Sequence, residues 1–180
     1  RELFKGLYID STDYDWKEHP VVHIDFSKCQ EDNKEKIKEW INDILFQIAK
    51  EYKIKLNKKK SYSFNLDLLI TELAKKEKVV ILIDEYDSLL NSNVNNDNIE
   101  GIREVLRGFY SVLKASSANI RFCFITGVTK FSKMSIFSSM NNLVDMSMSD
   151  EYSTMLGYTQ EELEENFSEY IEKAVKENKK

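Results

Sequence analysis

Two carboxylates directly follow the most apolar run of the sequence. Residues 79–83 are five consecutive apolar residues, and Asp84 and Glu85 come next. A continuous run rich in β-branched residues predicts a strand that is buried on both faces of a parallel sheet. Functional groups of such a sheet gather beyond the carboxyl ends of its strands. There, Asp84 is suited to support Mg²⁺, which prefers oxygen ligands, and Glu85 is suited to orient or deprotonate an attacking water.

This order of residues is typical of the Walker B motif of P-loop ATPases, where in-line phosphoryl transfer needs positioning and charge neutralisation. The simpler alternative is that Asp84 caps the next turn and Glu85 is merely exposed; the length of the apolar run favours the motif. Asp87 extends the acidic edge, and we expect it to cap a helix or order the loop. A metal-dependent nuclease using Asp84, Glu85 and Asp87 is less favoured, because no Glu-x-Lys follows on a neighbouring strand.

Polar residues also follow the next apolar run, residues 120–125. Thr126 is placed to contact a γ-phosphate or the attacking water, and Gly127 would let the backbone approach a neighbour closely. Thr129 and Lys130 come next, and the lysine would neutralise phosphate charge. An ordinary strand-to-turn transition has the same spacing, so the sequence leaves both interpretations open.

The sequence lacks the phosphate-binding loop that normally accompanies a Walker B strand. That loop requires GxxxxGK[ST] between a strand and a helix. None of the five glycines is followed by Lys: Gly6, Gly101, Gly108, Gly127 and Gly157. The chain also starts at Arg1 without a Met, so we expect either an excised fragment or a processed N-terminus.

Strand-like and helix-like segments alternate along the chain, which predicts an α/β fold with a mostly parallel sheet and flanking helices. Helical periodicity is clear in residues 37–52 and 66–73. Asp97 with Glu100, and Thr159 with Glu162, have the spacing of capping boxes that open two further helices. The Asn-rich residues 91–98 are expected to form a loop. Four strands are predicted, at residues 21–27, 79–83, 120–125 and, more weakly, 143–148. We expect one core domain over residues 1–158 and a terminal helical segment over 159–180.

Composition narrows the class of protein. Hydrophobic residues make up 42% of the 180 residues, enough for one core, and the net charge is −5. This charge gives no reason to expect unaided nucleic-acid binding, although a local basic face is not excluded, and residues 58–60 are expected to be solvated loop. No apolar run could cross a bilayer, and no signal-peptide pattern is present. Cys29 and Cys123 are far apart, so we expect reduced thiols in a cytoplasmic protein.

Several blocks of residues together resemble the bacterial AAA-ATPase-like family over nearly the whole chain. The most specific are Ile-Asp-Glu-Tyr-Asp at 83–87 and Ile-Thr-Gly-Val-Thr-Lys-Phe-Ser-Lys at 125–133; the others are residues 3–9, 19–22, 109–110, 135–138, 141–143 and 157–162. The resemblance implies ATP and Mg²⁺ as cofactors, with Asp84 binding the Mg²⁺–nucleotide and Glu85 as catalytic base. It also implies Thr126, or Thr129 with Lys130, as the sensor of the γ-phosphate. Family members usually carry an upstream P-loop, and many carry a downstream nuclease-like domain.

The resemblance also implies a P-loop NTPase-like core of the AAA type with sheet order 5-1-4-3-2, of which this chain would lack the first strand. We therefore expect the last two strands to pair directly, or the gap to be filled by a homo-oligomer or swapped dimer. In the intact protein we expect ATP binding and hydrolysis, with nucleotide bound only when the missing loop is present. The alternative is a non-hydrolysing interaction module with a degenerate fold. The sequence identifies no protein partner and indicates neither a nucleic acid nor a membrane.

Overall fold

The computed structural model describes residues 1–128, 135–137, 140, 142–155 and 157–177. The chain forms two compact units, residues 1–141 and residues 142–180. The domain boundary predicted after residue 158 stays a prediction.

The first unit contains a three-stranded parallel sheet in the order β1-β2-β3. The strands are β1 (Val21–Asp25), β2 (Val79–Asp84) and β3 (Ile120–Ile125). All three are rich in Val, Ile and Phe, whose branched or aromatic side chains favour a pleated surface. The predicted α/β fold with a parallel sheet is confirmed, and the observed order agrees with the 4-3-2 part of the predicted sheet.

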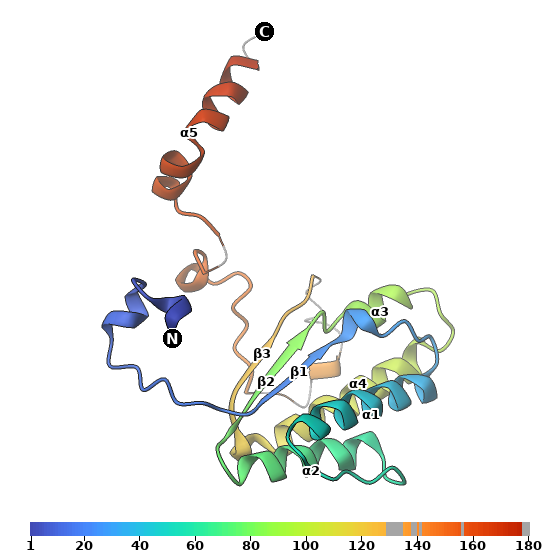
Figure 1. Ribbon diagram of the computed structural model, residues 1–180. Coiled ribbons are helices and arrows are strands. Elements are labelled where there is room, and N and C mark those ends of the chain that lie inside the picture. Colours follow the sequence, from blue (N-terminus) through green and yellow to red (C-terminus); the bar gives the residue numbers. More distant parts are fainter. Residues whose placement is uncertain (129–134, 138–139, 141, 156, 178–180) are drawn as a thin grey trace. The chain divides into compact units, whose positions relative to one another are not determined.

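Helices cover one face of this sheet (Figure 1). The three long ones are α1 (Lys34–Glu51), α2 (Tyr62–Ala74) and α4 (Ile99–Ala115), and α3 (Ser88–Ser92) is a short helix after β2. Asn33 caps α1 by accepting a hydrogen bond from the Glu35 amide, and Ser61 caps α2 in the same way from Phe64. Short 3₁₀ turns occur at Glu2–Phe4, Tyr8–Ser11, Phe26–Lys28, Ser117–Asn119 and Ser135–Phe137.

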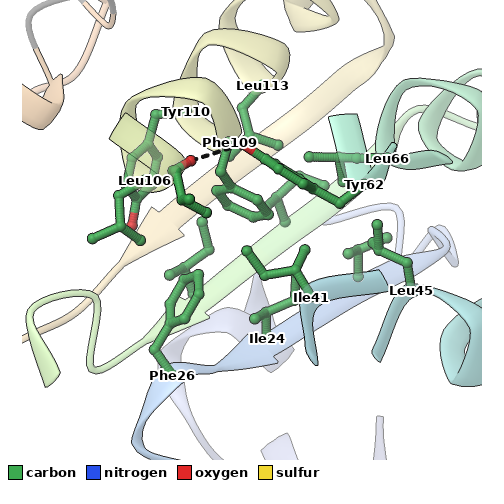
Figure 2. Close-up of a cluster of buried hydrophobic side chains, with 14 of the residues drawn as sticks. Ile24, Phe26, Ile41, Leu45, Tyr62, Leu66, Leu106, Phe109, Tyr110 and Leu113 are labelled. Atoms are coloured by element: carbon green, nitrogen blue, oxygen red, sulfur yellow. Dashed lines mark hydrogen bonds between the residues drawn. The ribbon is translucent and has the colours of Figure 1, made fainter. Parts of the chain in front are cut away.

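The core lies between the sheet and these helices (Figure 2). Ile24, Leu45 and Phe109 are fully buried, and each such side chain contributes roughly 1.5–3 kcal/mol. The Phe26 ring meets the Phe109 ring edge-on, with centroids 5.6 Å apart. Tyr62 is also buried, and its hydroxyl donates a hydrogen bond of 3.0 Å to the Val105 carbonyl.

The described helices of the first unit leave the opposite face of the sheet uncovered. On β2, Val79, Ile81 and Ile83 are buried, whereas Val80 and Leu82 are only half-buried. The strand register places two rows of side chains on this open face, namely Val21, Val80 and Phe122, then His23, Leu82 and Phe124. The prediction that β2 is buried on both faces is therefore wrong for the described chain. The apolar run does form a strand, but only one of its faces is buried, because all three long helices lie on the same side of the sheet.

The predicted fourth strand is also wrong. Residues 143–146 have no regular secondary structure, residues 147 and 148 form a turn, and Val144 is 76% exposed. Direct pairing of the last two predicted strands therefore does not occur, and in the described chain β3 is hydrogen-bonded to β2 alone. The expectation that a dimer or swapped dimer fills the gap stays a prediction.

Two local predictions near α4 need correction. Asn98 occupies the N-cap of α4 and makes no side-chain capping bond, so Asp97 and Glu100 do not form the expected capping box. The predicted loop 91–98 is instead helical at its start, because α3 continues to Ser92. Its remainder is fixed by asparagine amides: Asn93 donates to the Leu89 carbonyl at 2.9 Å, and Asn96 to the Asp32 carbonyl at 3.0 Å.

The second unit contains α5 (Gln160–Glu177). Its predicted capping box is present: the Thr159 amide donates to Glu162 Oε2 at 2.8 Å, and the Glu162 amide donates to Thr159 Oγ1 at 3.1 Å. The helix shows an apolar stripe that stays at least partly exposed, with Ile171 43% and Val175 47% exposed. Among the helices of the described residues, none is long and apolar enough to cross a membrane.

Candidate active site at the carboxyl ends of the strands

Three polar residues stand side by side where the strands end. Asp25 and Asp84 are register partners across β1 and β2, and Thr126 follows the pair formed by Ile83 and Ile125. Because side chains alternate along a strand, all three lie on the open face of the sheet, beyond the apolar rows. The Thr126 hydroxyl donates a hydrogen bond to Asp84 Oδ1. The structure thus brings together Asp84 and Thr126, which the sequence places in separate candidate motifs.

Glu85 has an unusual backbone conformation. Its φ angle is +52°, in the left-handed region that non-glycine residues rarely occupy. Hydrogen bonds hold the turn on both sides: the Glu85 amide donates to Asp84 Oδ1 at 3.1 Å, and the Glu85 carbonyl accepts from the Ser88 amide at 2.9 Å. Such a conformation costs about 1–3 kcal/mol and is found preferentially at functional sites. The side chain is half-buried, whereas Asp84 is exposed.

The backbones after β2 and β3 are joined at the same place. The Thr126 amide donates to the Ile83 carbonyl at 2.9 Å, and the Tyr86 amide donates back to the Thr126 carbonyl at 3.0 Å. These two bonds extend the pairing of the strands around Asp84 and Glu85. The position of Thr126 relative to the two carboxylates is therefore set by the backbone as well as by its hydroxyl.

Asp87 is fully buried beneath this turn. Its Oδ1 accepts a hydrogen bond of 3.3 Å from the Val128 amide, and its Oδ2 accepts one of 2.9 Å from Asn91 Nδ2. Asp87 precedes α3 but makes no side-chain capping bond, so its contacts agree with the predicted role of ordering the loop. A buried, hydrogen-bonded carboxylate is poorly placed to join exposed Asp84 on a metal, which counts against the nuclease alternative.

Gly127 permits a close approach between the two segments. A Cβ added there would lie 2.5 Å from Tyr86 Cδ1 and 2.6 Å from Asp87 Oδ1, closer than real Cβ atoms approach their neighbours. The Tyr86 ring also packs on Phe137, with centroids 5.1 Å apart, and Phe137 packs on Tyr110 at 4.7 Å. The prediction that Gly127 allows close backbone approach is supported by this geometry.

Asp25 lies at the same edge of the sheet, and the sequence interpretation did not single it out. Its carboxylate accepts hydrogen bonds from the Ser27 hydroxyl at 2.6 Å and the Ser27 amide at 3.0 Å, and Lys28 Nζ lies 3.3 Å away. The hydroxyl, followed by the amide and Lys28, lowers the pKa of this carboxyl against the opposing effect of burial. The available signal was an Asp ending an apolar strand, the same pattern that identified Asp84. Thr129 and Lys130 lie outside the described residues.

The donor set at this edge suits Mg²⁺. Asp84 and Thr126 offer carboxylate and hydroxyl oxygens, which are the hard ligands that this ion takes. Within the described residues no three His, Cys, Asp or Glu side chains converge on a metal position. An edge with one or two carboxylates fits an ion that keeps several waters and shares its remaining ligands with substrate phosphates.

Comparison with known proteins identifies a family and a relative. A family model described as Predicted AAA-ATPase matches residues 1–137. A protein of Azotobacter chroococcum mcd 1, described as an uncharacterized protein in the vnfD 5′ region, is 36% identical over 174 residues, covering 92% of this chain and 33% of that protein. The chain therefore spans about a third of the length of this curated relative. No solved structure matches the chain.

Proposed function

The chain belongs to the AAA-ATPase-like family of predicted AAA-ATPases, and on that premise we propose that Asp84, Glu85 and Thr126 form the carboxylate half of an ATP-hydrolysing site. The hydrogen bond from Thr126 to Asp84 is the observation that carries this proposal, because it joins two strand ends at one point. The phosphate-binding half would come from a Gly-Lys-Thr loop in the intact protein. Bound Mg²⁺ would neutralise the charge that develops on the β- and γ-phosphates.

Asp84 is held in a single orientation by two donors. The Thr126 hydroxyl and the Glu85 amide both bond to Oδ1. Within the described part of the chain Oδ2 has no hydrogen-bond partner, and the side chain is exposed. This oxygen is the one we assign to Mg²⁺ or to a water in its shell.

Glu85 is the proposed base that orients the attacking water and takes its proton. General bases contribute typically 10²–10⁴-fold to a rate, provided that they are held within reach of the proton. The left-handed backbone at Glu85 and the bonds that flank it fix the start of this side chain before any substrate binds. That is the kind of preorganisation that such a base requires.

Thr126 is the proposed sensor of the γ-phosphate. A hydroxyl has one proton to donate, so the bond to Asp84 and a bond to a phosphate oxygen are alternatives. Exchange between them would report the presence of the γ-phosphate to the carboxylate. Thr129 and Lys130, which follow in the sequence, are the proposed alternatives for sensing and for neutralising phosphate charge.

Hydrolysis is tested in a protein that carries this chain together with a phosphate-binding loop. We expect Glu85→Gln to lower kcat by about 10²–10⁴-fold with little effect on ATP binding, since the base acts in the chemical step. Glu104→Gln on the exposed face of α4 is the matched control and should leave kcat unchanged. Unchanged activity in Glu85→Gln would show that Glu85 is not the base. ATP binding without hydrolysis by the unsubstituted protein would favour the interaction module.

The 180-residue chain alone should not bind ATP measurably, because none of its glycines precedes a lysine. Isothermal titration calorimetry with Mg²⁺ and ATP checks this expectation. Micromolar binding would refute the claim that the phosphate-binding loop is essential.

A further inference from the structure

The connection between α1 and α2 concentrates positive charge in a chain that is acidic overall. Residues 50–60 contain six lysines and one glutamate, a net charge of +5, whereas the whole chain carries −5. All six lysines are exposed, and in the described part of the chain none of them forms an ion pair: Lys50, Lys53, Lys55, Lys58, Lys59 and Lys60. Their charge is therefore available to a partner.

A buried side chain fixes the part of this connection that carries Lys58, Lys59 and Lys60. Asn65 on α2 is fully buried, and its Nδ2 donates to the Asn57 carbonyl at 3.1 Å and, more weakly, to the Lys60 carbonyl at 3.5 Å. Its Oδ1 accepts from the Asn57 amide at 3.2 Å.

The same Nδ2 also donates to Asn42 Oδ1 on α1 at 2.9 Å. A lysine-rich loop that is only solvated does not require hydrogen bonds from a buried side chain. A loop that holds its lysines in one arrangement does require them, and Asn65 provides them. Preorganisation lowers the ordering cost when a loop binds.

An aromatic ring lies next to the lysines. Phe64, in the first turn of α2, is 47% exposed, and Lys60 Nζ lies 5.4 Å from its ring centroid. The backbone that carries the ring is fixed, because the Phe64 amide donates a hydrogen bond of 3.3 Å to Ser61 Oγ. An exposed ring beside several cations is the combination on which single-stranded nucleic acids bind, with bases stacked on the ring and phosphates on the cations.

We propose that residues 57–60 and Phe64, here named the lysine loop, bind single-stranded nucleic acid. Lys58, Lys59 and Lys60 contact successive phosphates, and Phe64 stacks on a base. The acidic remainder of the chain does not prevent this, because charges further away than about 8 Å are largely screened at physiological salt. A short loop with one ring lacks the long apolar helix face by which proteins lie on bilayers, so an anionic membrane is the less favoured partner.

Fluorescence anisotropy of a labelled oligothymidylate of about 20 nucleotides tests the proposal on the full chain at about 50 mM and about 200 mM salt. Replacing Lys58, Lys59 and Lys60 by Ala should weaken binding at least about tenfold at the lower salt. It should also reduce the slope of log K against log salt by about 2, since each contacted phosphate of a single strand contributes about 0.7.

A second triple variant, with Lys75, Lys76 and Lys78 replaced by Ala, changes the net charge equally at the far end of α2. This variant should weaken binding less than about twofold, because it removes the same positive charge but does not remove any of the proposed phosphate contacts.

Phe64→Ala separates stacking from charge. It should weaken oligothymidylate binding at least about fivefold, which is the lower limit for losing one stacked base, and leave binding of inorganic polyphosphate unchanged. Equal losses in the two triple variants would overturn the proposal. So would tighter binding to phosphatidylserine vesicles than to the oligonucleotide, or no oligonucleotide binding at the lower salt.

Discussion

Gly127→Ala is the sharpest perturbation of the close contact between the segments that follow β2 and β3. The new Cβ would lie 2.5 Å from two Tyr86 ring carbons and 2.6 Å from Asp87 Oδ1. Neither neighbour moves away freely, because the ring packs on Phe137 and the carboxylate is bonded to the Val128 amide. The backbone of Gly127 is not left-handed, so the substitution adds no strain of a left-handed residue.

The expected cost follows from two opposing effects. Overpacking a well-packed site destabilises by about 1–3 kcal/mol. Replacing Gly by Ala restricts the unfolded chain and stabilises by about 0.4–1 kcal/mol. We therefore expect a net loss of about 1–2 kcal/mol, which lowers the urea midpoint by about 0.5–1 M for an m-value near 2 kcal/mol/M. Tryptophan fluorescence follows the unfolding, since Trp40 packs on Phe26 in the same core.

Gly101→Ala is the matched control. Its Cβ would meet Lys34 Cδ at 3.0 Å, which is part of a flexible side chain, and a helix interior favours Ala over Gly by about 1 kcal/mol. This variant should be as stable as the wild type or more so. In a Tyr86→Ala background, the cost of Gly127→Ala should fall by at least about 0.5 kcal/mol. Wild-type stability of Gly127→Ala, or an unchanged cost without the Tyr86 ring, would refute the steric argument.

Two further predictions concern ionisable groups, the buried Asp87 and the half-buried Cys123. Asp87→Ala leaves the Val128 amide without its acceptor and should lower the free energy of unfolding in urea by about 1–3 kcal/mol. Hydrogen exchange at that amide should also become faster. Asp87→Asn keeps Oδ1 as an acceptor and should lower the free energy of unfolding by less. Burial raises the pKa of the Cys123 thiol from 9.0 to about 11, so the folded state keeps a proton that the unfolded state loses near pH 9. This stabilisation is complete below about pH 9 and is lost as the pH rises through about 11. The unfolding free energy of the wild type should therefore fall relative to that of Cys123→Ala over this range, and a constant difference would contradict the reasoning.

The strands and the terminal cap could be predicted because their signals are local. The apolar run 79–83 became β2 (Val79–Asp84), and Thr159 with Glu162 formed the expected capping box. Asp97 has the same spacing from Glu100, yet Asn98 takes the cap position, because the helix starts one residue later than the pattern implies. Residues 143–148 have strand-like composition, but no neighbouring strand pairs with them in the described chain.

The site was predictable where it follows from the order of parallel strands, and unpredictable where it depends on distant contacts. Asp84 and Thr126 meet because adjacent strands end at one edge. The left-handed backbone of Glu85 could not be foreseen, since the bonds that hold it include one between Tyr86 and Thr126 across the sheet. Asn65 is likewise a polar residue whose burial becomes intelligible only with its partners in place.

The two proposed sites lie toward opposite ends of β1. The lysine loop follows Tyr52, whose hydroxyl accepts a hydrogen bond from the Val21 amide at the start of β1, whereas Asp84 is paired with Asp25 at the end of that strand. Four residues of strand span about 13 Å, more than the screening length of about 8 Å at physiological salt. Charge on the lysine loop therefore has little direct effect on the carboxylates. If an oligonucleotide alters ATP hydrolysis, the effect must pass mechanically through the packed helices, and it should persist at a salt concentration that still allows the oligonucleotide to bind.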